Sequence, residues 1–453
     1  MPSDGNPRSI TSGLDSIFAP ATARGRSALA VIRISGPSAG STLDRLCDRN
    51  RPKPRRASLR HVKHPTTGEG LDQALVLWFP GPASATGEDV VELHLHGGPA
   101  VVAGLLDALS AEPGLRLAEP GEFARRAFAN DKLDLTQIEG LADLVAAETG
   151  AQRRQALAQA EGTLSARLAA WREALLQAAA LVEAQLDFSD EEIPDGLAAR
   201  ASGQAAAVAE EIRGVLARAP WGERLREGIS CALLGAPNVG KSSLLNALAG
   251  RDAAIVTDRP GTTRDPIEVS LDLAGLPVTL IDTAGIARAS QDPIEREGIR
   301  RSLQRAEQSD LALLVVDLSR SEALPDALAE IPPERRLTVG NKADLGPSDL
   351  AGLDLAMSAK TGAGLDRLLA LLTDKAESLM AASNGEAALV SRARQRNALQ
   401  DALEALDRGA VAPLPELFAE EIRLALRAFG RVAGRVDVED VLDRLFGEFC
   451  IGK

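Results

Sequence analysis

The chain has 453 residues, of which 45% are hydrophobic and 25% are charged, and this length and composition indicate a globular protein of roughly three domains. Its net charge of −13 argues against a broad electrostatic surface for nucleic acid, so any RNA contact has to be local. Residues 1–13 form a polar extension, which we expect to be disordered, rather than a signal peptide, and no apolar run approaches the length of a membrane span, so a cytoplasmic protein is predicted.

The first part of the chain shows the patterns of an α/β domain. Apolar runs that end at glycine and proline predict strands over residues 28–34, 73–78 and 90–96. Residues 100–110 follow the third run and have the pattern of a helix.

Charged side chains occur inside two of these strands. Arg33 lies in an apolar run, where a charge needs a partner, so it either pairs internally or holds an anionic ligand. Glu92, His94 and His96 alternate onto one face of the third strand. They are candidate metal ligands, although a polar sheet face that lines a pocket is the simpler interpretation.

The composition then shifts to alanine, leucine, glutamine and glutamate at helical spacing, which predicts long packed helices from residue 133. The apolar stripe consists of Ala156, Ala160, Leu164, Leu168, Trp171 and Leu175. The acidic run 187–192, followed by Pro194 and Gly196, predicts a solvated break between helices.

Helical spacing returns over residues 387–409 and 415–449, where the stripe includes Leu417, Ile422, Leu426 and Phe429. Neither helical flank looks like a complete domain. We therefore interpret residues 226–373 as a domain inserted between two parts of one helical domain, which requires that the ends of the insert lie close together.

The inserted region opens with a phosphate-binding motif. The apolar run 231–234 leads into the glycine-containing loop 235–242 and then into a helix start. The glycines allow backbone N–H groups to surround phosphate oxygens, Lys241 can reach the terminal phosphates, and the Ser242 hydroxyl can bind Mg²⁺.

Two further motifs follow in the order that a GTPase needs. Asp282 ends a predicted strand, where its carboxylate can hold the hydration shell of Mg²⁺, and the Gly285 N–H can sense the γ-phosphate. Thr262 and Thr263 lie where a switch threonine would meet Mg²⁺.

The last motif selects the base. Asp344, in the run 341–344, can accept two hydrogen bonds from the guanine edge, and adenine has no such donor pair, so GTP is the expected nucleotide. The run 358–360 lies where a loop would support the base. The residues assigned to GTP are Asn238, Val239, Gly240, Lys241, Ser242, Ser243, Thr257, Asp258, Arg259, Pro260, Gly261, Thr262, Thr263, Asp282, Thr283, Ala284, Gly285, Asn341, Lys342, Ala343, Asp344, Ser358, Ala359 and Lys360.

Beyond these motifs, the chain resembles the MnmE (TrmE) family of tRNA modification GTPases. The resemblance rests on the nucleotide motifs and on the runs 31–36, 86–90, 120–123, 130–135 and 449–453. It implies a tetrahydrofolate-binding α/β domain over residues 1–132, and an all-α domain over 133–225 and 374–453. A Ras-like P-loop GTPase domain over 226–373 then interrupts the helical domain.

The resemblance also implies function. Family members act as homodimers with the flavin-bearing partner MnmG, in a heterotetramer-type complex, and install an aminomethyl-type group at C5 of the wobble uridine of certain tRNAs. The one-carbon donor is 5-formyl- or methylene-tetrahydrofolate, and Arg33, Glu92, Lys132 and Lys453 would contact it.

The same resemblance implies a GTPase stimulated by K⁺ and by dimerisation of its GTPase domains. The K⁺ ligands would be Asn238, Thr257, Arg259 and Thr262, and Mg²⁺ would be held by Ser242 and Thr263. Such a cation would neutralise the charge that develops between the β- and γ-phosphates.

Catalytic residues are less clear from the pattern. Ile286 follows Gly285 where many GTPases carry a water-orienting glutamine, and the resemblance gives that role to Glu295, with Glu297 as a rival and a surface glutamate as the plain alternative. Lys241 is expected to act on the phosphates. Cys450 is implied in the modification step, either as a covalent catalyst or structurally, and Cys47 and Cys231 do not pair with it in any disulfide or zinc spacing.

Two other functions share the nucleotide motifs. A ribosome-assembly switch would need a terminal RNA-binding module or a second GTPase domain, and the sequence predicts neither. A scaffold whose nucleotide only sets conformation would show almost no hydrolysis in potassium.

Overall fold

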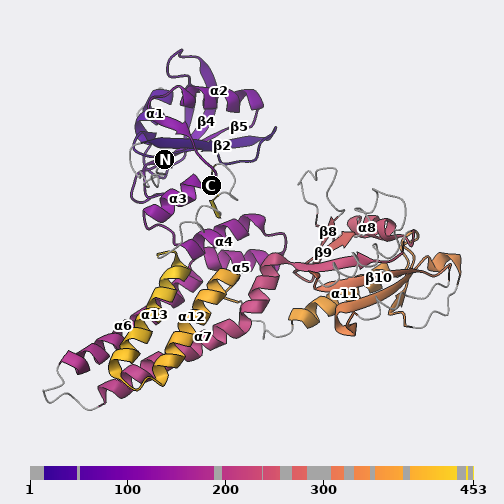
Figure 1. The fold of residues 1–453 in the computed structure, drawn as a ribbon. Coiled ribbons are helices and arrows are strands. Elements are labelled where there is room, and N and C mark those ends of the chain that lie inside the picture. The colour runs from indigo at the N-terminus through magenta and orange to yellow at the C-terminus, as the bar shows by residue number, and fades with distance from the viewer. Residues whose placement is uncertain are drawn as a thin grey trace, which may run out of the picture. The chain divides into compact units, whose positions relative to one another are not determined.

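The computed structural model describes residues 15–47, 51–187, 196–236, 238–251, 253–255, 268–282, 308–320, 331–346, 352–380, 388–435, 445–446 and 452. The chain folds into two compact units, which are drawn in Figure 1. The N-terminal unit consists of Met1–Ala142 and Gly430–Lys453, and the central unit is Asp143–Phe429. No helix in the described ranges combines the length and the apolar character needed to cross a membrane.

The N-terminal unit is built on a six-stranded sheet in the order β3-β4-β5-β2-β1-β6. All neighbours are antiparallel except β1 and β6. The predicted strands correspond to β2, β4 and β5, and the strand bounds are Ser16–Pro20 (β1), Leu29–Ser35 (β2), Ser58–Lys63 (β3), Gly70–Phe79 (β4), Val90–His96 (β5) and Leu115–Leu117 (β6).

Helices cover both faces of this sheet (Figure 1). Helices α1 (Ala39–Leu46) and α2 (Pro99–Ser110) bury leucines against one face, together with Ile32 and Leu93. Helix α3 (Glu122–Ala129) packs Phe123 against Ile17 on the opposite face. Helix α4 (Leu135–Ala146) follows α3.

The tail of the chain belongs to this unit. The sequence predicts residues 374–453 as one helical part, whereas Gly430–Lys453 groups with the N-terminal unit. The cause is hydrophobic contact, because Leu445 and Phe446 are buried in one cluster with Leu135 and Ile138. Helical periodicity carries no information about partners so distant in sequence.

Helices make up the flanks of the central unit. They are α5 (Gly150–Ala160), α6 (Thr163–Asp187), α7 (Leu197–Glu227), α12 (Ala393–Ala410) and α13 (Pro415–Ala433). Figure 1 shows α6, α7, α12 and α13 side by side. The predicted stripe of α6 is buried at Leu164, Leu168, Trp171 and Leu175, and the Trp171 ring lies 5.8 Å from that of Phe429.

Two details of the second helical flank differ from the prediction. Leu417 is 49% exposed, because the buried face of α13 runs through Ala419, Ile422 and Phe429. Helix α13 ends at Ala433, so the predicted helical stretch 415–449 is interrupted there. Residues 445–446 are again helical, and residues 436–444 and 447–449 lie outside the described residues. Gly434 then adopts φ 83°, where helices commonly end.

The inserted region contains a second six-stranded sheet in the order β12-β11-β10-β7-β9-β8. Only the β8–β9 pair is antiparallel. The strands are β7 (Ile229–Leu234), β8 (Glu268–Leu273), β9 (Leu276–Asp282), β10 (Leu311–Asp317), β11 (Arg336–Asn341) and β12 (Leu355–Ala356). Its described helices are α8 (Lys241–Ala249) and α11 (Leu365–Met380), with short 3₁₀ turns over Pro333–Arg335 and Ala343–Leu345.

The strands β7 and β10 are almost continuously buried, as expected for parallel strands covered on both faces. Helix α11 runs past the predicted boundary at residue 373, and Ala376 and Met380 share the hydrophobic cluster of this sheet. The multidomain α/β plus α architecture predicted from the sequence is confirmed. The carboxyl ends of β7, β9, β10 and β11 meet at one edge, and that edge carries the nucleotide motifs.

Candidate active site

The phosphate-binding loop leaves the end of β7 in a backbone shape that its glycines permit. Gly235 and Gly240 have φ of 148° and 97°, and Asn238 between them has φ 64°. A Cβ on Gly235 would collide with the Val315 carbonyl oxygen, and one on Gly240 would collide with the Asn341 amide. The loop is thus held against neighbouring strands, and α8 starts directly after it with N–H groups free to meet an anion.

Lys241 lies beneath this loop and is only 6% exposed. Its Nζ donates hydrogen bonds to the carbonyl oxygens of Gly235 at 2.6 Å and Ala236 at 2.9 Å. Burial lowers the pKa of Lys241, and the nearby Asp282 carboxylate opposes that shift. A buried ammonium group held by carbonyl oxygens gains strongly from phosphate oxygens, which is the chemistry expected of this lysine.

Ser242 lies in the first turn of α8 and contacts Asp282, the last residue of β9. The Ser242 hydroxyl donates to Asp282 Oδ2 at 3.3 Å, and Asp282 is 1% exposed. One hydroxyl and one carboxylate oxygen form the kind of donor set that Mg²⁺ prefers, so these residues fit that ion.

The guanine motif is joined to the phosphate loop through Asn341, which is 2% exposed. Its Nδ2 donates to the Val239 carbonyl at 2.9 Å, and its Oδ1 accepts from the Ala359 N–H at 2.9 Å. The Ser358 hydroxyl donates to Asp344 Oδ1 at 2.6 Å. Three motifs that are far apart in sequence therefore form one hydrogen-bonded site.

Lys342 adds a contact that sequence reasoning missed. Its backbone is left-handed at φ 68°, and its Nζ donates to the Asn238 carbonyl at 2.9 Å and to Asp317 Oδ2 at 2.6 Å. Burial raises the pKa of Asp317, but hydrogen bonds from Lys342 and Ser319 outweigh it and hold the pKa below its ordinary value. The sequence signal that could have revealed this contact is Asp317, an aspartate at the end of the buried apolar strand β10.

Several predicted site residues lie outside the described residues. They are Thr257, Asp258, Arg259, Pro260, Gly261, Thr262, Thr263, Thr283, Ala284, Gly285, Glu295, Glu297, Cys450 and Lys453. Of the remaining nucleotide residues, Ser243 lies in the first turn of α8, Ala343 begins the 3₁₀ turn after Lys342, and Lys360 follows Ala359.

In the N-terminal unit, Arg33 and Glu92 face each other across β2 and β5. Arg33 donates through Nε at 3.0 Å and Nη2 at 2.9 Å to Glu92 Oε1, and the two side chains are 26% and 20% exposed. The Arg33 guanidinium also lies 5.7 Å from the centroid of the Phe123 ring. Of the two alternatives for Arg33, the structure thus contains the internal pair, with part of the guanidinium still exposed.

Of the two histidines of β5, only His94 lies near Glu92. His94 Nε2 lies 3.5 Å from Glu92 Oε2, whereas His96 turns to Asp72, its Nδ1 lying 2.8 Å from Oδ1. No group of three potential metal ligands is found within the part of the chain that the structure describes. Lys132 is exposed and lies beside Gly87. A Cβ added to Gly87 would be 3.2 Å from the Cε atom of Lys132.

An ion cluster around Arg126, next to this sheet, was not predicted. Arg126, with a side chain 12% exposed, donates to Glu88 at 3.1 Å, to Asp15 at 3.0 Å and to Glu122 at 3.0 Å. The Ser35 hydroxyl also donates to Glu88, at 2.7 Å. These contacts tie the runs 86–90 and 120–123 to β1 and β2.

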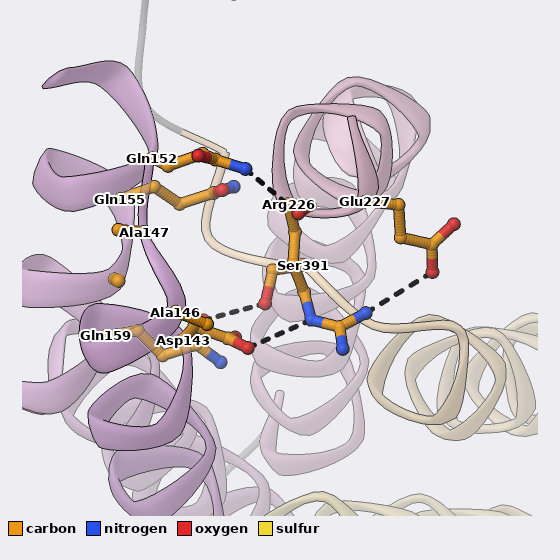
Figure 2. Close-up of a pocket in the computed structure, with 10 residues that line it drawn as sticks. Asp143, Ala146, Ala147, Gln152, Gln155, Gln159, Arg226, Glu227 and Ser391 are labelled. Atoms are coloured by element: carbon orange, nitrogen blue, oxygen red, sulfur yellow. Dashed lines mark hydrogen bonds and ion pairs between the residues drawn. The ribbon is translucent and has the colours of Figure 1, made fainter. Parts of the chain in front are cut away.

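The helical part of the central unit contains a cavity of ≈130 Å³ (Figure 2). In Figure 2 the Arg226 guanidinium lies between the carboxylates of Asp143 and Glu227, with distances of 3.1 Å and 3.3 Å. Asp143 Oδ1 also accepts from Arg392 Nη2 at 2.6 Å. Arg226 lies in the last turn of α7, just before β7, so this ion cluster lies where the chain leaves the helices for the nucleotide-binding sheet.

Comparison with known proteins covers both units. The model of the GTP-binding protein TrmE N-terminus matches residues 16–132, and the model of the MnmE helical domain matches residues 135–450. The tRNA modification GTPase MnmE of Methylorubrum populi is 56% identical over 97% of this chain and 98% of its own length. Proteins of that name from Methylobacterium sp. strain 4-46 and Parvibaculum lavamentivorans are 54% and 50% identical, each over 97% of this chain and 100% of their own.

These matches extend well beyond the nucleotide motifs, which many GTPases share. They include the N-terminal sheet and the helices on both sides of the inserted sheet. The chain therefore belongs to the MnmE (TrmE) family of tRNA modification GTPases, and it is an enzyme that hydrolyses GTP.

Proposed function

We propose that this GTPase is stimulated by K⁺ and, with a flavin-dependent MnmG partner, installs carboxymethylaminomethyl or aminomethyl groups at C5 of the wobble uridine of certain tRNAs. The observation that carries the proposal is the hydrogen-bonded site in a chain of this family, in which Asn341 bonds Val239 and Ala359, and Ser358 bonds Asp344. A guanine site coupled to the phosphate loop suits a nucleotide cycle that drives a modification step.

GTP would bind across the ends of β7, β9, β10 and β11. Lys241 would exchange its carbonyl partners for the terminal phosphates, and Ser242 would hold Mg²⁺ with Thr263, supported by Asp282. Mg²⁺ supplies neutralisation of the β- and γ-phosphates when bound. In the same proposal Asn238, Thr257, Arg259 and Thr262 hold K⁺, with Arg259 acting through its backbone carbonyl.

Hydrolysis needs an oriented water, and the proposal gives that role to Glu295, with Glu297 as the alternative. The carboxylate would act when the GTPase domains of two copies meet, which makes the functional form a homodimer. The GTPase domain is taken as residues 226–373 together with the remainder of α11 to Met380, because that helix shares the hydrophobic cluster of the sheet.

The folate site would lie on the α3 face of the N-terminal sheet. Arg33 and Glu92 together offer a donor and an acceptor group, as a pterin edge and a glutamate tail require. Lys132 would contribute from the loop beside Gly87. Gly452 packs against the carbonyl oxygen of Pro20 at the end of β1. This contact of the residue before Lys453 supports the proposed roles of Lys453 and Cys450, which themselves lie outside the described residues.

The test is mass spectrometry of nucleosides from bulk tRNA of cells that lack this gene. We expect the C5-modified wobble uridines to disappear, and to return with the wild-type gene but not with Cys450→Ser. Unchanged nucleosides in the deletion strain would contradict the proposed modification and direct attention to ribosome assembly. GTP hydrolysis by the purified protein in KCl and NaCl provides the second readout, and equal rates in the two salts would contradict the K⁺ site.

A further inference from the structure

Positive charge is concentrated in one short segment of the N-terminal unit. Residues 51–64 contain Arg51, Lys53, Arg55, Arg56, Arg60 and Lys63 and no aspartate or glutamate, within a chain of net charge −13. Such a segment is the local basic surface that an acidic protein needs if it is to contact nucleic acid.

The segment also has a concave shape. It leads into β3, which is the edge strand of the sheet, and together with β3 it lines an open cavity of ≈740 Å³. We call this cavity the β3 groove and define it by Arg51, Lys53, Arg56, Ser58 and Arg60. An open groove at a sheet edge suits an extended anionic chain better than a small enclosed anion.

Two arginines of the segment are held in place by the protein itself. Arg51 pairs with Asp44 at 2.7 Å, and its guanidinium lies 4.6 Å from the centroid of the Trp78 ring. Arg55 lies over the Phe79 ring at 5.7 Å and donates to the Ala83 carbonyl. These contacts fix the wall of the groove and account for those two charges.

The other cations of the groove have no carboxylate partner among the described residues. Lys53 and Arg56 are exposed and form no ion pair there. Arg60 Nη1 donates only to the carbonyl of Leu59 at 3.1 Å, and its Nε is buried with no acceptor in the described part of the chain. A buried donor without an acceptor is unfavourable, so the Nε–H of Arg60 is placed to donate a hydrogen bond to an oxygen atom of a ligand.

We propose that the β3 groove binds the phosphodiester backbone of RNA, and this inference rests on the proposed function in taking tRNA as that RNA. Arginine and lysine side chains bind phosphate oxygens strongly, and arginine does so through two N–H groups at once. Trp78 is covered by Arg51 and is 5% exposed, so it offers no stacking surface to unpaired bases. The groove therefore contacts the backbone of a folded RNA and does not read its sequence.

The test uses the full-length protein and a fluorescent unmodified tRNA transcript, with anisotropy measured between 50 and 200 mM KCl. The variant Lys53→Glu/Arg56→Glu changes two exposed side chains and leaves the packed core intact. The matched control Arg153→Glu/Arg172→Glu makes the same change of net charge on exposed positions of α5 and α6. We expect the groove variant to bind on the order of tenfold more weakly and to lower the salt slope of log K by about two, because two phosphate contacts are lost.

The control variant should bind tRNA as the wild type does. Equal affinity and equal salt slope for the groove variant and the wild type would overturn the proposal, as would absence of tRNA binding by the wild type. Arg60→Lys keeps the charge but removes the buried Nε, and it should weaken binding less than Arg60→Gln does. Equal binding by these two variants and the wild type would remove Arg60 from the site.

Two comparisons separate this inference from its alternatives. If the groove variant lost binding to poly-glutamate or to phosphatidylglycerol vesicles but kept tRNA binding, the partner would be an acidic protein or a membrane and the RNA proposal would be wrong. Expression of the groove variant in the deletion strain separates the two proposals. If the groove variant fully restores wobble-uridine modification and binds tRNA with normal affinity, only the RNA-binding role of the β3 groove is contradicted. If the deletion strain has unchanged tRNA nucleosides, only the proposed function is contradicted.

Discussion

At the scale of single residues, we expect Asp344 to decide which base the GTPase accepts. The Ser358 hydroxyl donates to Asp344 Oδ1 and so orients this carboxylate, whose oxygens would accept hydrogen bonds from the guanine edge. Asp344→Asn replaces one acceptor by a donor, and we expect GTP to bind about 100-fold more weakly, because a charge-assisted hydrogen bond is lost and a donor then faces a donor. Xanthosine triphosphate, which carries an oxygen at that edge, should bind the variant better than GTP does, as titration calorimetry with both nucleotides would show.

Asp366→Asn is the matched control for this prediction. Asp366 lies in α11 with a side chain 85% exposed, and it forms an ion pair with Arg251 at 2.8 Å. The same chemical change there should leave the preference for GTP intact. A preference for GTP that survives Asp344→Asn would show that the carboxylate does not select the base.

Glu122 makes a pH-dependent contribution to the N-terminal unit. Burial raises its pKa, but hydrogen bonds from Arg116, from the Glu119 backbone N–H and from Arg126 outweigh burial and lower the pKa below the ordinary value of 4.5. A carboxylate with a lowered folded pKa stabilises the fold fully above 4.5, and the contribution is lost as pH falls through the folded pKa.

We therefore expect Glu122→Gln to speed amide hydrogen exchange in β1 and α3 by roughly tenfold at pH 7, relative to wild type at the same pH. The ratio between variant and wild type should remain constant down to about pH 5 and shrink below 4.5. Glu119→Gln, at an exposed position three residues earlier, serves as the control and should show no difference. A ratio that stays constant into acid would show that the ionised form of Glu122 does not stabilise this unit.

The nucleotide residues could be predicted because their chemistry fixes their spacing within single motifs. Asp282 and Asn341 were found in this way, and the structure brings them to one sheet edge. Arg126 was missed because its partners Asp15 and Glu88 come from other elements, and only the tertiary fold brings them together. The sequence likewise left two partners open for Arg33, since the pairing of β2 with β5 decides between them.

At the scale of elements, Asp143 links α4 to α7 and to the segment before α12. Its Oδ1 accepts from both Arg226 and Arg392, and its side chain is only 15% exposed. Asp143→Ala would leave two largely buried guanidinium groups without this acceptor, at a cost of about 2–4 kcal/mol. We expect faster limited proteolysis of the helices and a lower midpoint of thermal unfolding.

Asp143→Asn retains an oxygen acceptor without the charge and should have an intermediate effect. Glu210→Ala removes a carboxylate that is 78% exposed from an ion pair with Arg213, and it should change the midpoint very little. If Asp143→Ala resembled Glu210→Ala, the cluster beside the cavity would have no structural role.

Elements with a strong pattern were predicted well, and weakly patterned ones were not. β5 follows an apolar run bounded by turn residues, and its bounds agree with the prediction. β3 was missed because three of its six residues are arginine, histidine and lysine, and as an edge strand it does not need two apolar faces. β6 was missed because it has only three residues.

At the scale of the whole molecule, the sequence predicted the order of the domains and the inserted GTPase fold. Helical composition on both sides of the nucleotide motifs predicted the insertion, whereas the domain order and the GTPase fold were predicted from the motifs and the family resemblance. Periodicity could not predict that the C-terminal residues pack in the N-terminal unit, because the partners of Phe446 are Ala124, Leu135 and Ile138. Contacts between residues about 300 positions apart depend on the fold of the whole chain between them, which local periodicity does not describe.

The position of Phe446 also affects how the protein is made. The ribosome has to synthesise the entire central unit before Leu445 and Phe446 can join α3 and α4 in their shared cluster. Nascent domains generally fold in order from the N-terminus. The N-terminal unit, although begun first, is therefore completed last, and until then the apolar faces of α3 and α4 are exposed to chaperones and to neighbouring nascent chains.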